Sequence, residues 1–135
     1  MKKSSDPHSL NKLIESGKFD WVSPDITDKR FPKPQRICTD FKVFNSRNNI
    51  TSGEVVQNMH AFKCEPANSH ELLLFDRWDE HNPIASLGSI MTPHNPNGVL
   101  FLNKKGSERN ICFGFWNVIW GPNFYFLAIS RNAKH

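Results

Sequence analysis

The sequence predicts a single α+β domain spanning the 135 residues, in which two or three helices pack on a mainly antiparallel sheet. Two helix-start signals support the α part, since Thr51 with Glu54 and Asn68 with Glu71 have capping-box spacing. After Pro83, short aromatic and β-branched runs alternate with Pro, Gly and Asn, which is typical of antiparallel strands. Eleven Phe and four Trp supply bulky apolar groups for one core.

Residues 1–17 are predicted to hold a peripheral N-terminal helix. Its apolar side chains fall on one helical face, which consists of Leu10, Leu13 and Ile14. Gly17 suits the left-handed conformation that commonly ends a helix. We therefore expect a short helix attached to the outside of the domain.

Residues 18–36 are predicted to form an ordered, proline-rich loop. A long helix is excluded because prolines recur at positions 24, 32 and 34. Four apolar side chains should pin the loop to the core: Phe19, Trp21, Ile26 and Phe31.

The middle of the chain is predicted to form one strand and two helices. The strand covers residues 37–44 and places on one side Ile37, Thr39, Phe41 and Val43. The first helix follows Thr51 and carries an apolar stripe of Val55, Val56, Met59 and Phe62. The second helix follows Asn68 and extends to Trp78.

Four strands are predicted in the last part of the chain, over residues 84–91, 98–103, 109–116 and 124–130. The segment from Lys104 to Ser107 has the composition of a hairpin loop. Helices followed by consecutive strands indicate that the helices pack on an antiparallel sheet.

Charge is unevenly distributed, although the net charge is only +4. Residues 1–47 hold ten Lys or Arg against six Asp or Glu, residues 48–102 hold two against six, and residues 103–135 hold five against one. Two basic segments therefore flank an acidic one. They either neutralise it within the fold or attract nucleic acid or an acidic protein.

The composition favours a cytoplasmic protein without a membrane segment. The basic N-terminus lacks the apolar core of a signal peptide, and Pro, Gly and Asn interrupt the most apolar stretch, residues 111–129. The three cysteines, Cys38, Cys64 and Cys112, are widely separated and form no CxxC motif, so reduced thiols are expected.

No catalytic residue, metal site or cofactor is predicted. His60 and Cys64 have the spacing of helical metal ligands, but a zinc site needs further ligands, and only His70 and His81 follow. The phosphate-binding glycine motifs and the hydrolase motifs GxSxG and HExxH are absent.

Several segments resemble recurring blocks of a group of uncharacterised small bacterial and phage-associated proteins. These segments are Gly17–Val22, Ile26–Thr27, Phe31–Pro32, Glu71–Leu73, Pro83–Ser89 and Phe126–Ala128. The resemblance implies an independently folding domain and no particular chemistry.

A second, weaker similarity is to C-type-lectin-like modules, in which a strand and two helices precede a Trp-rich antiparallel sheet. The matching segments occur in the same order: Asn68–Leu73, Leu87–Ser89, Trp116–Asn117 and Phe126–Ile129. Calcium-binding lectins carry a Trp-Asn-Asp triplet, where this chain has Trp116-Asn117-Val118, and the paired cysteines are lacking. The resemblance therefore implies a protein-binding scaffold without calcium.

The sequence favours a non-enzymatic module that recognises a protein partner through loops and exposed aromatic rings. The predicted contact residues are Asn95, Trp116, Asn117, Trp120, Asn123 and Tyr125. The alternative is nucleic-acid binding, which would also suit a phage-encoded inhibitor of host defence. It would use the basic residues Lys29, Arg30, Lys33, Arg36, Lys104, Lys105 and Arg109. Neither hypothesis predicts an oligomeric state.

Overall fold

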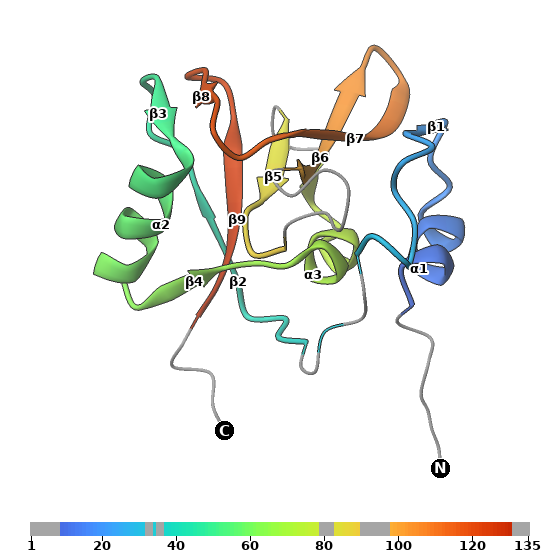
Figure 1. The fold of residues 1–135 in the computed structure, drawn as a ribbon, viewed down its shortest axis with the longest axis horizontal. Coiled ribbons are helices and arrows are strands. Elements are labelled where there is room, and N and C mark those ends of the chain that lie inside the picture. Colours follow the sequence, from blue (N-terminus) through green and yellow to red (C-terminus); the bar gives the residue numbers. More distant parts are fainter. Residues whose placement is uncertain (1–8, 32–33, 35–36, 79–82, 90–97, 131–135) are drawn as a thin grey trace.

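The computed structural model describes residues 9–31, 34, 37–78, 83–89 and 98–130. They form a seven-stranded sheet, a two-stranded sheet and three helices, α1 (Leu10–Gly17), α2 (Ser52–Ala61) and α3 (Ser69–Leu74) (Figure 1). The strands are β1 (Trp21–Val22), β2 (Phe41–Phe44), β3 (Ile50–Thr51), β4 (Cys64–Pro66), β5 (Ile84–Ser86), β6 (Gly98–Lys105), β7 (Glu108–Phe115), β8 (Ile119–Trp120) and β9 (Tyr125–Ser130). The predicted α+β fold is confirmed.

The main sheet has the strand order β1-β7-β6-β5-β9-β2, and β4 also pairs with β9. Two of its pairings, β1 with β7 and β5 with β9, are parallel, whereas the other four are antiparallel. Strand β9 returns beside β5 after the long β6–β7 hairpin, and β3 and β8 form the small second sheet. The sheet is therefore mixed but mostly antiparallel.

Both faces of the sheet are covered, because successive side chains alternate between two core clusters. In β6, Leu100 and Leu102 face the first cluster and Val99 faces the second. In β9, Leu127 faces the first cluster and Phe126 faces the second. Residues of α1 and α3 belong to the first cluster and residues of α2 to the second, so the helices pack on opposite faces.

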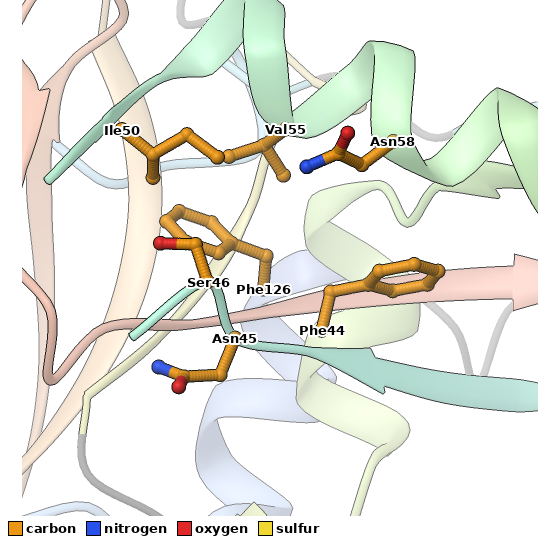
Figure 2. A pocket seen from close by; sticks show the side chains of 7 residues that line it. All are labelled: Phe44, Asn45, Ser46, Ile50, Val55, Asn58 and Phe126. Carbon is orange, nitrogen blue, oxygen red and sulfur yellow. The ribbon is translucent and has the colours of Figure 1, made fainter. Parts of the chain in front are cut away.

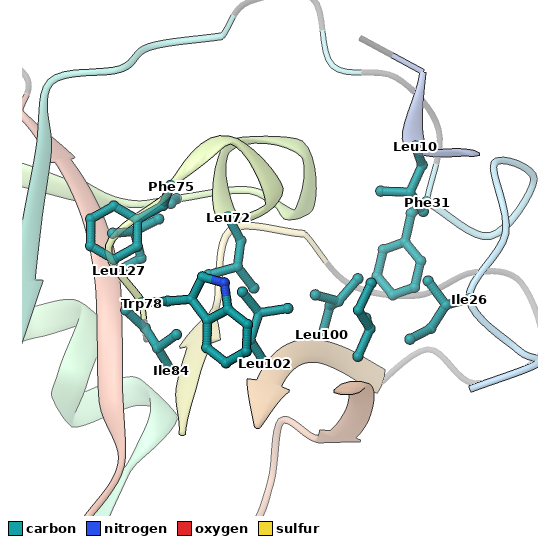
Figure 3. Packing of buried hydrophobic residues seen from close by; sticks show 12 residues of the cluster. Leu10, Ile26, Phe31, Leu72, Phe75, Trp78, Ile84, Leu100, Leu102 and Leu127 are labelled. Carbon is teal, nitrogen blue, oxygen red and sulfur yellow. The ribbon is translucent and has the colours of Figure 1, made fainter. Parts of the chain in front are cut away.

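Helix α1 lies at the rim of the molecule (Figure 1) but contributes to its core. Leu10 is fully buried and lies beside Phe31 and Ile26 in the first cluster (Figure 3). Ser9 caps the helix, since its hydroxyl accepts a hydrogen bond of 3.3 Å from the backbone N–H of Lys12. The helix is thus fixed to the domain through buried side chains.

The C-terminal end of α1 differs from the prediction. The left-handed residue is Lys18, with φ 54°, whereas Gly17 is the last helical residue. A Cβ on Gly17 would collide with the ring of Phe19. The glycine therefore lets this ring approach closely, and its own backbone conformation does not demand a glycine.

Both predicted capping boxes are present. The Thr51 hydroxyl accepts from the Glu54 N–H at 3.2 Å, and the Glu54 carboxylate accepts from the Thr51 N–H at 3.0 Å. Asn68 and Glu71 exchange two equivalent hydrogen bonds of 2.8 Å each. These reciprocal bonds fix where α2 and α3 begin.

Helix α3 is shorter than predicted. It ends at Leu74, because Phe75 adopts an extended conformation with ψ 113° and buries its ring in the first cluster. Trp78 is also buried there. The run of apolar residues after Asn68 is therefore divided between a helix and a tight turn, and periodicity alone does not reveal that division.

The described part of the proline-rich loop, residues 18–31 and Pro34, begins with β1 at the edge of the main sheet. Ile26 and Phe31 are buried as expected. The expectation for Trp21 is wrong, since this side chain is 50% exposed. It lies on the edge strand opposite Asn110, so backbone pairing and not its ring holds the segment.

The predicted C-terminal strands correspond to β5, β6, β7 and β9, although β5 is shorter and the end of its predicted range lies outside the described residues. The predicted hairpin loop is also shorter, because both lysines belong to β6. The turn consists of Gly106, with φ 62°, and Ser107. The prediction missed β1, β3, β4 and β8, each of which has two or three residues and is too short for a periodic pattern. Within the described ranges, no helix is long and apolar enough to span a bilayer.

Candidate functional site

Residues 115–119, here named the apolar turn, comprise the last residue of β7, the connection 116–118 and the first residue of β8, and they expose large apolar side chains. The exposed fractions are 46% for Phe115, 36% for Val118 and 68% for Ile119. Asn117 is exposed between them. Phe115 and Ile119 belong to strand ends and Val118 to the connection, so three large apolar side chains are exposed within five residues, and exposed apolar patches often mark a binding surface. The apolar turn is therefore the first candidate for a contact surface.

The apolar turn is anchored from below by Ser52, the first residue of α2. The Ser52 hydroxyl donates a hydrogen bond of 2.6 Å to the backbone carbonyl of Trp116 and accepts one of 2.8 Å from the indole N–H of Trp120. Ser52 and Trp120 are both buried. One hydroxyl thus ties both ends of the turn to the helix.

Trp120 itself is a core residue, which corrects the prediction of an exposed contact ring. It is 3% exposed, and its ring meets those of Phe101, Phe124 and Phe126 at centroid distances of 6.4, 4.8 and 5.7 Å. The indole N–H is satisfied by Ser52, so the whole side chain can be buried. Trp120 supports the turn and does not form its outer surface.

A polar groove lies beside the apolar turn, over the loop of residues 45–49. Three adjoining hollows form it. The central hollow shares Asn45 with one outer hollow and shares Ser46, Ile50 and Asn58 with the other. Figure 2 shows the central hollow, with Ile50, Val55 and Asn58 on one side and Asn45 and Ser46 on the other. The outer two hollows have volumes of about 280 and 480 Å³.

The groove is rich in carboxamides. They are Asn45, Asn48, Asn49, Gln57, Asn58 and Asn123. Asn45 holds the loop in place, since its amide donates to the backbone carbonyls of Pro122 at 3.0 Å and Phe124 at 2.7 Å. At one end the lining includes Arg47 and Tyr125. The other end includes Glu54, whose pKa is lowered by its hydrogen bond from the Thr51 backbone N–H.

The predicted contact residues are thus divided between these surfaces. Asn117 lies on the apolar turn, and Asn123 and Tyr125 line the groove. Trp116 is half-buried and packs against the second cluster. Asn95 lies outside the described residues. The sequence therefore identified the region but not which of its rings are exposed.

The predicted basic residues differ in their exposure and in their contacts. Lys29, Lys104 and Lys105 are exposed, whereas Arg30 approaches Asp25 at 3.4 Å. Two further members, Lys33 and Arg36, lie outside the described residues.

Arg109 differs from the other basic residues, because it is half-buried and its guanidinium lies 5.2 Å from the ring centroid of Phe19 and 5.1 Å from that of Trp78. These rings line a hollow of about 410 Å³ beneath α1 and α3. Its backbone N–H donates to the Asp20 carboxylate at 2.7 Å, which ties β7 to the segment before β1. Arg109 is therefore less exposed than the three lysines and is held against two aromatic rings.

Among the described residues, the histidines and cysteines are not assembled into a site. His60 is exposed on the last turn of α2, and Cys64 is buried with its thiol directed at the Phe62 carbonyl at 3.5 Å. His70 is buried, and His81 lies outside the described residues. Across the part of the chain that the structure describes, no group of three potential metal ligands occurs. Burial raises the pKa of the Cys112 thiol.

Glu71 is a buried carboxyl that sequence reasoning assigned only to capping. Besides its bond with Asn68, it accepts a hydrogen bond of 2.7 Å from the backbone N–H of Cys38, which fixes the entry to β2 against α3. Burial raises the pKa of the Glu71 carboxyl, and the two backbone hydrogen bonds oppose this shift by smaller amounts. Its role is structural, because it lies away from both candidate surfaces.

Sequence reasoning missed the groove and the three exposed apolar side chains of the turn. One signal could have indicated the region, since residues 110–130 contain no Asp, Glu, Lys, Arg or His. No protein-family model, curated protein or solved structure matches the chain. The candidate function therefore rests on the geometry of the turn and the groove.

Proposed function

We propose that the protein is a binding module that recognises a protein partner through the apolar turn. The observation that carries this proposal is the exposure of Phe115, Val118 and Ile119 on one short, anchored connection. Fully burying an exposed isoleucine or phenylalanine side chain contributes about 1.5–3 kcal/mol, and Phe115 and Ile119, which are 46% and 68% exposed, can each contribute about half of that. The turn can therefore supply the apolar centre of an interface.

The absence of charge in residues 110–130 supports the same function. Charged side chains are costly to desolvate and are depleted at interface centres. A partner can therefore cover the turn without burying an ionised group of this segment.

The rigid support beneath the turn is the second supporting feature. Ser52 fixes both Trp116 and Trp120, and the ring of Trp120 is enclosed by other aromatic rings. A surface that is already ordered before binding loses less conformational entropy when a partner covers it.

The test compares partner recovery by three forms of the protein. The wild-type chain, Ile119→Asp and Phe62→Asp are immobilised, and bound proteins are identified by mass spectrometry. Phe62 is the matched control, because it is 72% exposed and lies away from the turn, after α2. A partner held by the wild type and by Phe62→Asp, but lost from Ile119→Asp, supports the proposal.

Two results would count against it. Equal recovery by Ile119→Asp would remove the turn from consideration, provided that circular dichroism shows all three forms folded. Recovery dominated by nucleic acid that elutes steeply with salt would instead support the alternative based on Lys29, Lys104 and Lys105.

A further inference from the structure

We infer that the polar groove over residues 45–49 binds an extended segment of the partner protein and that Arg47 receives a carboxylate of that segment. This inference deepens the proposed function and rests on it. The groove is adjacent to the apolar turn, since β3 supplies Ile50 to the groove and pairs Thr51 with Ile119 of the turn.

The chemistry of the lining fits a peptide backbone. Each carboxamide presents a hydrogen-bond donor and an acceptor side by side, which is the complement of a peptide group. Six carboxamides occur along the groove, and they come from the 45–49 loop, from α2 and from the β8–β9 connection. Asn45 already donates to two backbone carbonyls and Asn48 to one, so the other four carboxamides supply most of the donors for a bound segment. Such a surface can satisfy the N–H and C=O groups of an extended segment at several successive positions.

The central hollow, with a volume of about 40 Å³, has room for a small apolar side chain of the same segment. Four of its lining side chains are apolar, Phe44, Ile50, Val55 and Phe126, and the other three are polar (Figure 2). Side chains of an extended segment alternate in direction, so one residue can enter this hollow while its neighbours point outward.

The charge at one end selects the chemistry of the segment. In the hollow lined by Asn45, Arg47, Pro122, Asn123 and Tyr125, the arginine is the one charged side chain among these described residues. Arginine binds carboxylates in a bidentate way, and Asn123 can add a further donor. The expected segment therefore has an acidic side chain or a terminal carboxylate next to an apolar residue.

The experiment uses a displayed library of random twelve-residue peptides, selected on the wild-type chain. Selected peptides are then measured against Arg47→Glu, Lys63→Glu and Ile119→Asp. Lys63 is a close control for Arg47, because both are exposed basic residues with positive φ, 61° and 63°. We expect selected peptides to share an acidic residue and to bind Arg47→Glu about tenfold more weakly or worse, with Lys63→Glu unchanged.

The outcomes separate the groove from the apolar turn. Loss of peptide binding in Arg47→Glu but not in Ile119→Asp supports the groove, and the turn is then tested by the partner recovery described above. The reverse pattern retains the turn and overturns the groove. Failure to select any peptide, selection insensitive to Arg47→Glu, or groove-dependent binding on a glycan array instead would each overturn this inference.

Discussion

Replacing Ser52 with Ala should destabilise the protein far more than the loss of one exposed hydroxyl would. The Ser52 hydroxyl satisfies two buried groups, the Trp120 indole N–H at 2.8 Å and the Trp116 carbonyl at 2.6 Å. Leaving a buried polar group without its partner costs about 1–3 kcal/mol. For two groups we expect a loss of about 2–4 kcal/mol in the free energy of unfolding.

Urea unfolding followed by far-ultraviolet circular dichroism measures this loss, because the midpoint then falls without a change in slope. The control is Ser107→Ala, in the exposed β6–β7 turn, for which we expect a change below about 0.5 kcal/mol.

A double-mutant cycle with Trp120→Phe isolates the hydroxyl–indole bond. Phenylalanine keeps an aromatic ring at this position but removes the N–H donor. The combined variant should lose less than the sum of the single losses, with a coupling of about 1 kcal/mol. A loss below about 0.5 kcal/mol in Ser52→Ala, or strictly additive effects in the cycle, would refute the anchoring role of Ser52.

Four further predictions concern the rest of the fold. Gly88→Ala should cost several kcal/mol in unfolding free energy, on the order of the largest single-site losses, because the new Cβ would lie 2.5 Å from a backbone carbonyl oxygen of β4. Gly53→Ala, with open space around its Cβ, should be neutral or stabilising in the same denaturation assay. Burial raises the pKa of Glu71 in the folded protein. Its contribution to the free energy of unfolding is therefore complete at pH values below the ordinary pKa and is lost as the pH rises through the pKa of the folded state. The stability difference between wild type and Glu71→Gln should therefore shrink as pH rises above about 4.5, and a growing difference would show that the folded pKa is lowered instead. Arg109→Ala should lower the free energy of unfolding by about 1–2 kcal/mol, because its guanidinium lies over two rings. The control Arg77→Ala, at an exposed residue over one ring, should lower it by less than about 0.5 kcal/mol. Equal losses would show that stacking over two rings adds no stability.

The sequence alone determined the starts of the helices, because capping is a local interaction. Thr51 with Glu54 and Asn68 with Glu71 lie three residues apart, so their reciprocal hydrogen bonds form within one turn of chain. The strands of the β6–β7 hairpin were predictable for a similar reason, since both strands and their turn are contiguous.

Only the tertiary structure decided which strands pair and which rings are exposed. The parallel partners of β1 and β5 come from distant segments of the chain, so no local pattern specifies them. Trp120 and Ile119 are neighbours in the sequence, yet one is buried and the other is 68% exposed. Successive side chains of β8 point to opposite faces, and the pairing of β8 with β3 decides which face is covered. Ser52, 68 positions before Trp120, then satisfies the indole N–H that is buried there.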